Sequence, residues 1–183
     1  EISECLVGSE MCIRDRARLV ANVYLTLDGN PYIYYGEEIG MQGEKPDERI
    51  REPFKWTADG SGMDTDWEDM LSNESTTALS EQMEDEGSMY HYYKKLISVR
   101  KNSEALSKGK FEAIDAGSDD VMAYRRVSDS QTVYAVHNFT DEKVTVKLPD
   151  AKGGKVIFTG SKKGTLSGDT IALDAYASIL IEK

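Results

Sequence analysis

The stretch Asp28-Gly-Asn-Pro-Tyr-Ile-Tyr-Tyr-Gly36 (DGNPYIYYG) decides how the first half of the chain is interpreted. Residues 32–35 form a run of aromatic and β-branched side chains, typical of a strand buried on both faces in a parallel sheet. Upstream, apolar residues recur with a helical period over 19–27, and the Asp-Gly-Asn-Pro turn ends that helix. Helix, tight turn and buried strand together predict an αβ unit.

A long segment, 37–87, follows the predicted strand and is broken repeatedly by Gly and Pro. Loops of this length are usually functional or disordered. The segment contains Met41, Phe54, Trp56 and Trp67, which is too much apolar surface for a disordered linker. After it, Ser88 is placed to cap a helix that ends near residue 102.

From residue 110 onward the pattern changes to short strands separated by turns, with no helix between them. The predicted strands are 111–114, 121–127, 132–138, 144–148, 155–159, 170–173 and 177–181. Such spacing predicts an antiparallel β-sandwich. Within 132–136 and 144–146 the residues alternate as expected for strands with one buried face and one face in water.

Residues 6–16 (LVGSEMCIRDR) fit none of these patterns. Reverse translation of 11–15 as ATG TGT ATA AGA GAC resembles the transposon end used in making sequencing libraries, and 6–10 resembles the adapter that precedes it. We therefore interpret residues 1–16 as translated adapter, with a genuine helical lead-in as the alternative. Under this interpretation both cysteines, Cys5 and Cys12, are foreign, and the natural protein continues upstream of Ala17.

The charge balance is strongly acidic. The formal net charge is −11, and removing residues 1–16 lowers Lys plus Arg from 22 to 20 and Asp plus Glu from 33 to 29, which leaves −9. An acidic chain does not favour nucleic acid binding, and no apolar run has the length of a membrane span. Between Lys55 and Lys94 there is no Lys or Arg, and we interpret the acidic residues there as a solvated loop rather than a calcium loop.

Several of these segments resemble one family. The sequence of Gly29–Trp56 (GNPYIYYGEEIGMQGEKPDERIREPFKW) resembles the last barrel strand and following loop of the α-amylase family, glycoside hydrolase family 13, through its Tyr-Gly-Glu-Glu and Arg-x-Pro-aromatic-x-Trp motifs. Ser88–Leu106 is similar to the final barrel helix. The resemblance implies an α/β part, the αβα end of a TIM (β/α)8 barrel over 17–106, and an all-β part, a C-terminal antiparallel sandwich over 107–183.

The resemblance also implies a retaining mechanism on α-glucosidic bonds, with a carboxylate nucleophile and a carboxylic acid that serves as acid and base. In the family these residues follow earlier barrel strands. We therefore expect a C-terminal fragment of a bacterial α-amylase in which no residue is catalytic and no residue binds a metal, and which is itself inactive. A calcium ion would belong to the parent enzyme.

Residues that directly follow a barrel strand face the mouth of the active site. This implies that α-glucan or maltooligosaccharide would contact Tyr35, Glu37, Arg51 and Trp56, with Arg51 holding hydroxyls and Trp56 stacking on a pyranose ring. The alternative is structural: Arg51 pairs with Glu37 or Glu38, and Trp56 packs under the loop. Glu37 and Glu38 are adjacent, so they do not fit a retaining pair whose carboxyls face each other about 5 Å apart.

Other interpretations stay open at this stage. The parent enzyme could instead be an oligo-1,6-glucosidase or a trehalose-type transglycosidase, and the sandwich could be a carbohydrate-binding or a structural module. His91 and His137 have no evident metal or triad partner. Asn73 and Asn138 begin glycosylation patterns to which we assign no role. The compartment is left undetermined.

Overall fold

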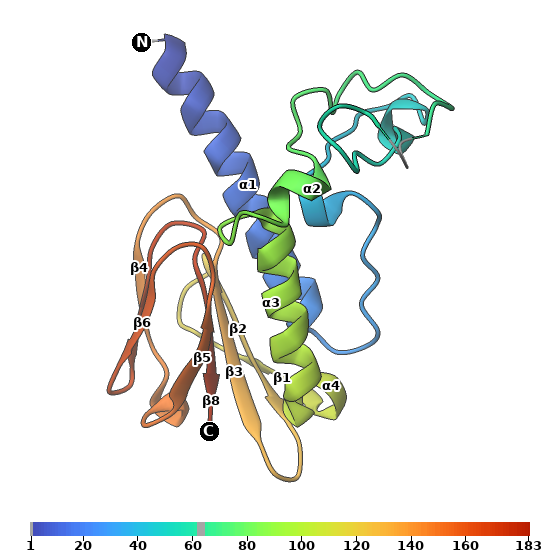
Figure 1. The fold of residues 1–183 in the computed structure, drawn as a ribbon. Coiled ribbons are helices and arrows are strands. Elements are labelled where there is room, and N and C mark those ends of the chain that lie inside the picture. The colour runs from blue at the N-terminus through green and yellow to red at the C-terminus, as the bar shows by residue number, and fades with distance from the viewer. Residues whose placement is uncertain (1, 62–64) are drawn as a thin grey trace. The chain divides into compact units, whose positions relative to one another are not determined.

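The structure is a computed structural model that describes the backbone of residues 2–61 and 65–183 and the side chains of 13–61 and 65–183. Residue 1, in the expected adapter segment, and residues 62–64, which include Asp64 of the acidic run, lie outside the described residues. The chain divides into two compact units (Figure 1). Unit 1 combines Glu1–Pro31 with Leu96–Lys183, and unit 2 is Tyr32–Lys95. The expected domain boundary at residue 106 stays a prediction.

Unit 1 contains eight strands among its described residues, arranged in two antiparallel sheets. The larger sheet has the order β1-β2-β3-β8-β5 and the smaller one β4-β7-β6. This agrees with the antiparallel sandwich predicted from the sequence, although β6 was not predicted. The strands are β1 (Lys110–Ile114), β2 (Val121–Val127), β3 (Thr132–Asn138), β4 (Val144–Lys147), β5 (Lys155–Thr159), β6 (Gly164–Ser167), β7 (Thr170–Leu173) and β8 (Ser178–Glu182).

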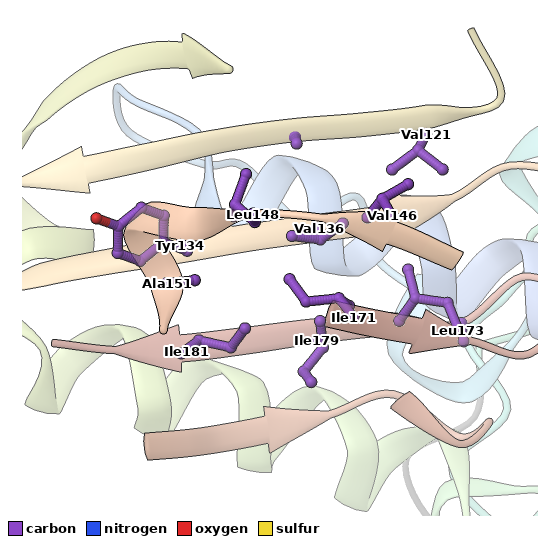
Figure 2. Packing of buried hydrophobic residues seen from close by; sticks show 12 residues of the cluster. Val121, Tyr134, Val136, Val146, Leu148, Ala151, Ile171, Leu173, Ile179 and Ile181 are labelled. Atoms are coloured by element: carbon purple, nitrogen blue, oxygen red, sulfur yellow. The ribbon is translucent and has the colours of Figure 1, made fainter. Parts of the chain in front are cut away.

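One apolar cluster fills the space between the two sheets (Figure 2). Val136 and Ile179 from the larger sheet meet Ile171 and Leu173 from the smaller one, and none of the four side chains is more than 1% exposed. Alternate residues of each strand supply this cluster, as the period of two requires. Burying one such side chain stabilises the fold by about 1.5–3 kcal/mol relative to leaving it exposed.

The other face of the larger sheet is buried as well along the central strands β2, β3 and β8, whereas the edge strand β1 is largely exposed. The buried face carries Tyr124, Arg126, Ala135, His137 and Leu180, all 0% exposed. Two helices, α1 (Ile2–Thr26) and α4 (Glu104–Lys108), contact strands of this sheet. The prediction of a water-facing side for residues 132–136 was therefore wrong, because polar side chains on that face find their partners in the protein.

Two arginines bind the carboxyl-terminal end of α1. Arg126 donates hydrogen bonds to the carbonyl of Thr26 (3.0 Å) and that of Gly109 (2.7 Å), and it pairs with the Asp28 carboxylate (3.1 Å). Arg100 donates to the carbonyls of Leu25 and Leu27 at 2.8 and 3.0 Å. The last carbonyls of a helix lack intrahelical partners and carry partial negative charge. The two guanidinium groups supply hydrogen-bond donors and positive charge to these carbonyls. The helix ends at the predicted turn.

Unit 2 shows where the predicted αβ unit fails. Residues 32–35 form no strand, and their side chains are 37–90% exposed. The prediction of a buried barrel strand is therefore wrong for this structure. A strand needs hydrogen-bonding neighbours, and the described residues provide no strand that pairs with this segment.

The remaining elements of unit 2 are short, apart from one helix. They are the 3₁₀ turns η1 (Glu37–Ile39) and η2 (Arg49–Arg51), the single-turn helix α2 (Leu79–Gln82), and the amino-terminal half of α3 (Met89–Asn102). Ser88 caps α3 as predicted, because its hydroxyl accepts a hydrogen bond from the His91 amide at 3.2 Å. Helices α2 and α4 and the turn η3 (Pro149–Ala151) were not predicted.

Candidate functional site

The four side chains expected to contact sugar all lie in unit 2. Tyr35 is 42% exposed, and its hydroxyl donates a hydrogen bond to the backbone carbonyl of Glu52 at 3.1 Å. Burial, and next the charge of Tyr34, raise the pKa of the Tyr35 phenol, while the positive charge of Arg51 acts in the opposite direction. The structure therefore brings Tyr35 within electrostatic range of Arg51, and Tyr35 stays protonated at neutral pH.

Glu37 begins the η1 turn directly after Gly36. Gly36 has φ 91°, and a Cβ at this position would lie 2.7 Å from the Met41 sulfur, so the turn requires glycine here. The Gly36 amide donates to the Glu38 carboxylate at 2.8 Å, while the hydroxyl of Tyr93 lies 3.5 Å from the Glu37 carboxylate. Glu38 is thus the carboxylate that orders the turn, and Glu37 lies near the hydroxyl of Tyr93.

Arg51 is the last residue of η2, and Trp56 lies on the segment that follows it. Arg51 forms an ion pair with Asp47 at 3.7 Å, and both side chains are about 60% exposed. The alternative that pairs Arg51 with Glu37 or Glu38 finds no support in this contact. Exposed pairs of this kind contribute little stability, so a ligand could compete for the guanidinium. The Trp56 ring packs against Phe54 with centroids 4.5 Å apart.

The most constrained group in the loop is Glu52, which the sequence analysis did not single out. Its carboxylate is 1% exposed and accepts hydrogen bonds from the amides of Ser72 (2.8 Å) and Asn73 (3.1 Å) and from the Asn73 side-chain nitrogen (2.8 Å). Burial alone would raise the pKa of this carboxyl, but the hydrogen bonds outweigh it and hold the pKa below its usual range. Glu52 is therefore ionised at neutral pH.

Asn73 carries this network to a third part of the loop. Its side-chain oxygen accepts from the Gln42 amide and its side-chain nitrogen donates to the Gln42 carbonyl, both at 2.7 Å. The same oxygen accepts from the Thr76 hydroxyl at 3.1 Å. With the bond to Glu52, all four hydrogen-bonding positions of the Asn73 amide are occupied. We call Gln42, Glu52 and Asn73 the loop clamp.

A second buried amide ties the beginning of the loop to its end. The Gln82 side chain, 5% exposed, donates to the carbonyls of Ile39 (2.7 Å) and Thr77 (2.9 Å) and accepts from the amide of Tyr90 (3.2 Å). The amides of Leu79 and Ser80 bind the backbone just after Glu52, each at 3.0 Å. The loop is therefore held by polar contacts at several points along its length.

Unit 1 contains a separate buried polar chain. The two ring nitrogens of His137 lie 2.9 Å from the Ser178 hydroxyl and 3.1 Å from the Tyr124 hydroxyl, and Tyr124 in turn bonds to Thr26 of α1 at 2.5 Å. Burial lowers the pKa of His137 to about 3 and raises that of Tyr124 to about 12. Both side chains are thus uncharged at neutral pH, and they link α1 to the sheet.

Other potential sites can be assessed directly. Among the described side chains of 13–61 and 65–183, no group of three or more His, Cys, Asp or Glu is arranged to hold a metal ion, and no described helix is long and apolar enough to cross a membrane. Asn73 and Asn138 are 1% and 0% exposed, so neither glycosylation pattern presents an accessible amide.

A surface pocket of about 510 Å³ in unit 1 is lined by polar residues such as Glu104, Gln131 and Lys155, and by none of the four predicted side chains.

The residues that sequence analysis missed are those with buried polar roles. Glu52 lies inside the Arg-x-Pro-aromatic-x-Trp motif, and Asn73 was noted only as part of a glycosylation pattern. Neither position has a periodicity that marks it as buried. The place of Glu52 between Arg51 and Pro53 in that motif is the signal that could have drawn attention to it.

Family models match the chain in two consecutive parts. Residues 4–109 match the α-amylase catalytic domain, and residues 121–180 match the C-terminal domain of the α-amylase SusG. The first match alone includes more than half of the chain. The chain belongs to the α-amylase family. The first match includes residues 6–16, whose origin in adapter DNA stays a prediction.

Curated relatives agree with this assignment. The chain is 37% identical over 172 residues to Alpha-amylase 3 of Dictyoglomus thermophilum, with 92% of this chain and 34% of the relative covered. It is 30% identical over 180 residues to Alpha-amylase SusG of Bacteroides thetaiotaomicron, with 92% and 26% covered. An oligo-1,6-glucosidase of Bacillus cereus matches at 26% identity over 176 residues, with 74% and 32% covered. The chain thus spans between 26% and 34% of the length of these relatives.

A solved structure shows the same fold. The crystal structure of an α-amylase from H. orenii superimposes with a TM-score of 0.78 at 36% identity and covers 93% of this chain and 36% of that one. The family assignment made from the Tyr-Gly-Glu-Glu and Arg-x-Pro motifs is therefore confirmed. Sugar contact by Tyr35, Glu37, Arg51 and Trp56 stays a prediction.

Proposed function

We propose that the protein to which this chain belongs is a retaining glycoside hydrolase that cleaves internal α-1,4-glucosidic bonds of starch or maltodextrin. The observation that carries the proposal is the 37% identity to an α-amylase over 92% of this chain, together with the consecutive matches to a catalytic and a C-terminal domain. In this family of reactions one carboxylate attacks the anomeric carbon and a second carboxylic acid protonates the leaving oxygen.

Within that enzyme, the loop of unit 2 would contribute to binding rather than to bond cleavage. Tyr35 and Arg51 interact electrostatically and could together hold sugar hydroxyls, and the half-buried Trp56 ring could stack on a pyranose face. Glu37 would accept a hydrogen bond from a hydroxyl. Glu37 and Glu38 differ in their contacts and follow each other directly, so neither serves as the partner of the other in a retaining pair.

The bond preference is tested with the complete gene product. We expect it to release maltooligosaccharides from maltoheptaose and to leave isomaltose and trehalose unchanged. Faster cleavage of isomaltose would favour the alternative of an oligo-1,6-glucosidase, which the 26% identity to such an enzyme supports more weakly. For the 183-residue chain we expect no turnover of a chromogenic maltoside above a buffer control.

For the sandwich we propose a structural role. On the central strands β2, β3 and β8 of the larger sheet, one face packs on the smaller sheet and the other is buried, so neither is open to a polysaccharide there. The exposed side of the smaller sheet presents a cross-strand row of Thr145, Ala172 and Thr165, none of them aromatic. Binding of soluble starch by the 183-residue chain in affinity electrophoresis that persists in Trp56→Ala would contradict this role, because it would place the binding outside the loop.

A further inference from the structure

Glu52 is unusual because it is an acidic residue buried within a loop. Its carboxylate is 1% exposed and ionised, and none of its hydrogen-bond donors carries a positive charge. Taking a carboxylate out of water costs several kcal/mol unless hydrogen bonds compensate. An uncharged side chain would fill the same volume without that cost. The charge is therefore informative about what this position does.

The three hydrogen bonds give the charge a specific geometric effect. Glu52 accepts from the amides of Ser72 and Asn73 and from the Asn73 side chain, and Asn73 is bound on its other side to both backbone groups of Gln42. Three separate segments of the loop, around residues 42, 52 and 73, are thereby joined through the Glu52 carboxylate and the Asn73 side chain. Charge-assisted hydrogen bonds of this kind are stronger and more directional than neutral ones, so the carboxylate defines one arrangement of the three segments.

The candidate sugar-binding residues are attached to this point. Tyr35 donates its hydroxyl hydrogen bond to the Glu52 carbonyl, Arg51 precedes Glu52, and the buried Pro53 follows it. Four residues further along, the carbonyl of Trp56 accepts from the amide of Ser80. The segment from Arg51 to Trp56 is therefore fixed at one end by the clamp and at the other by α2.

We propose that Glu52 is the positioning residue of this loop, whose ionised carboxylate sets the conformation that presents Tyr35, Arg51 and Trp56 to an α-glucan. The sugar-binding part of this statement rests on the proposed function. The structural part, in which the Glu52 carboxylate orders the segments around residues 42, 52 and 73, is independent of the proposed function. Glu52 itself makes no contact with substrate in this arrangement, because its carboxylate is buried and fully engaged.

The test uses the 183-residue chain and hydrogen exchange of the amides of Gln42, Ser72 and Asn73, expressed as protection factors at each pH. We expect Glu52→Gln to lower these three protection factors by about tenfold or more, because it removes the charge from the hydrogen bonds. The exchange of β3 and β8 should not change. The matched control is Glu44→Gln, an exposed acid of the same loop, which should change none of them.

The pH profile separates positioning by charge from simple filling of space. Tyr35, whose hydroxyl binds the Glu52 carbonyl, has a raised pKa and stays uncharged throughout the acid range, and Arg51 is the adjacent residue in the chain. In the unmodified chain, protection should fall as pH drops through the folded pKa of Glu52, below its usual range. In the Glu52→Gln chain, the protection of these amides should not change with pH. If Glu52 only filled space, the Glu52→Gln chain would show the same pH profile as the unmodified chain.

A second variant covers the case in which Glu52→Gln does not fold. Asn73→Asp keeps the acceptor for the Gln42 amide but places a second carboxylate against Glu52. Protection should be low at neutral pH and should increase on acidification, since two facing carboxylates share a proton. The unmodified chain and this variant should therefore show opposite slopes.

Two results would each overturn the assignment. They are equal protection in the unmodified and Glu52→Gln chains, and no recovery of Asn73→Asp on acidification. If Glu52→Gln loses protection throughout both units, the Asn73→Asp profile decides. None of these measurements requires sugar or turnover. A gene product that fails to cleave maltoheptaose would therefore refute the proposed function and leave the test of Glu52 independent.

Discussion

Unit 1 and unit 2 are ordered by different interactions. Unit 1 buries aliphatic side chains between two sheets and then covers the second face of its larger sheet, so Ile171, Ile179 and Leu180 are all 0% exposed. Unit 2 buries Glu52 and Asn73 at its centre, while Tyr32 and Leu71 stay 90% and 60% exposed. Apolar burial is strong and non-directional, whereas hydrogen bonds are weaker and directional. Unit 1 should therefore be the more stable of the two, and unit 2 the more sensitive to single polar atoms.

The largest effect is expected in the apolar core of unit 1. Ile179→Ala should lower the free energy of unfolding of unit 1 by about 2–5 kcal/mol, because it leaves a cavity between the sheets. Far-UV circular dichroism in urea follows the strands. Both tryptophans, Trp56 and Trp67, lie in unit 2, so tryptophan fluorescence follows that unit separately.

Val156→Ala is the matched control, because Val156 is 37% exposed on β5 and its truncation should cost less than about 0.5 kcal/mol. We expect the circular dichroism transition of Ile179→Ala to move and the fluorescence transition to stay in place. If both transitions moved by the same amount, the two units would unfold together and the distinction between them would be lost.

The next effect concerns how α1 is joined to the sheet. Arg126→Met should cost about 3 kcal/mol, since it leaves buried carbonyls of Thr26 and Gly109 without donors at about 1–3 kcal/mol each. Arg125→Met on the same strand is the control. Arg125 pairs with Glu112 at the surface, where such a pair contributes at most about 1 kcal/mol. Equal losses in urea unfolding would contradict the role assigned to the buried arginine.

Sequence patterns predicted unit 1 better than unit 2, and the reason is physical. The period of two and the turn residues identified seven of the strands, because side-chain alternation reports burial on a sheet. They missed β6, whose Gly164–Ser167 sequence has little apolar content, and they assigned water to a face on which Tyr124, Arg126 and His137 are buried. Burial of polar side chains depends on partners distant in sequence, so a local pattern does not report it.

The same limit explains the outcome for the loop. The run of Tyr32–Tyr35 has high β-propensity, yet propensity describes the fit to a pleated neighbour rather than an intrinsic shape, and no described strand pairs with it. The Tyr-Gly-Glu-Glu and Arg-x-Pro motifs identified the family because each complete motif matches the corresponding motif of the α-amylase family. The clamp residue Asn73 lies 21 positions from Glu52, and nothing in the sequence indicates that they meet.

Acid should destabilise unit 1 through His137. Its folded pKa of about 3 is lower than the ordinary value of 6.5, so the unfolded state binds a proton that the folded state does not. The stability that unit 1 gains from keeping His137 neutral is fully present above pH 6.5. It is lost as the pH falls from there toward 3. Between pH 7 and pH 5 we expect a loss of about 2 kcal/mol. His137→Gln should lack this part of the pH dependence, and an unchanged dependence in urea titrations would contradict burial of the neutral ring.

The smallest effect tests unit 2 from the side of Tyr35. Tyr35→Phe removes one neutral hydrogen bond to the Glu52 carbonyl and should cost about 0.5–1.5 kcal/mol in the fluorescence-detected transition. Tyr32→Phe is the control, because Tyr32 is 90% exposed. Since Glu52→Gln alters three charge-assisted bonds and Tyr35→Phe removes only neutral ones, the first substitution should destabilise the loop more. A larger loss of unfolding free energy in Tyr35→Phe than in Glu52→Gln would contradict the role of Glu52. It would mean that contacts at the amino-terminal end of the loop determine its conformation and that the Glu52 carboxylate does not.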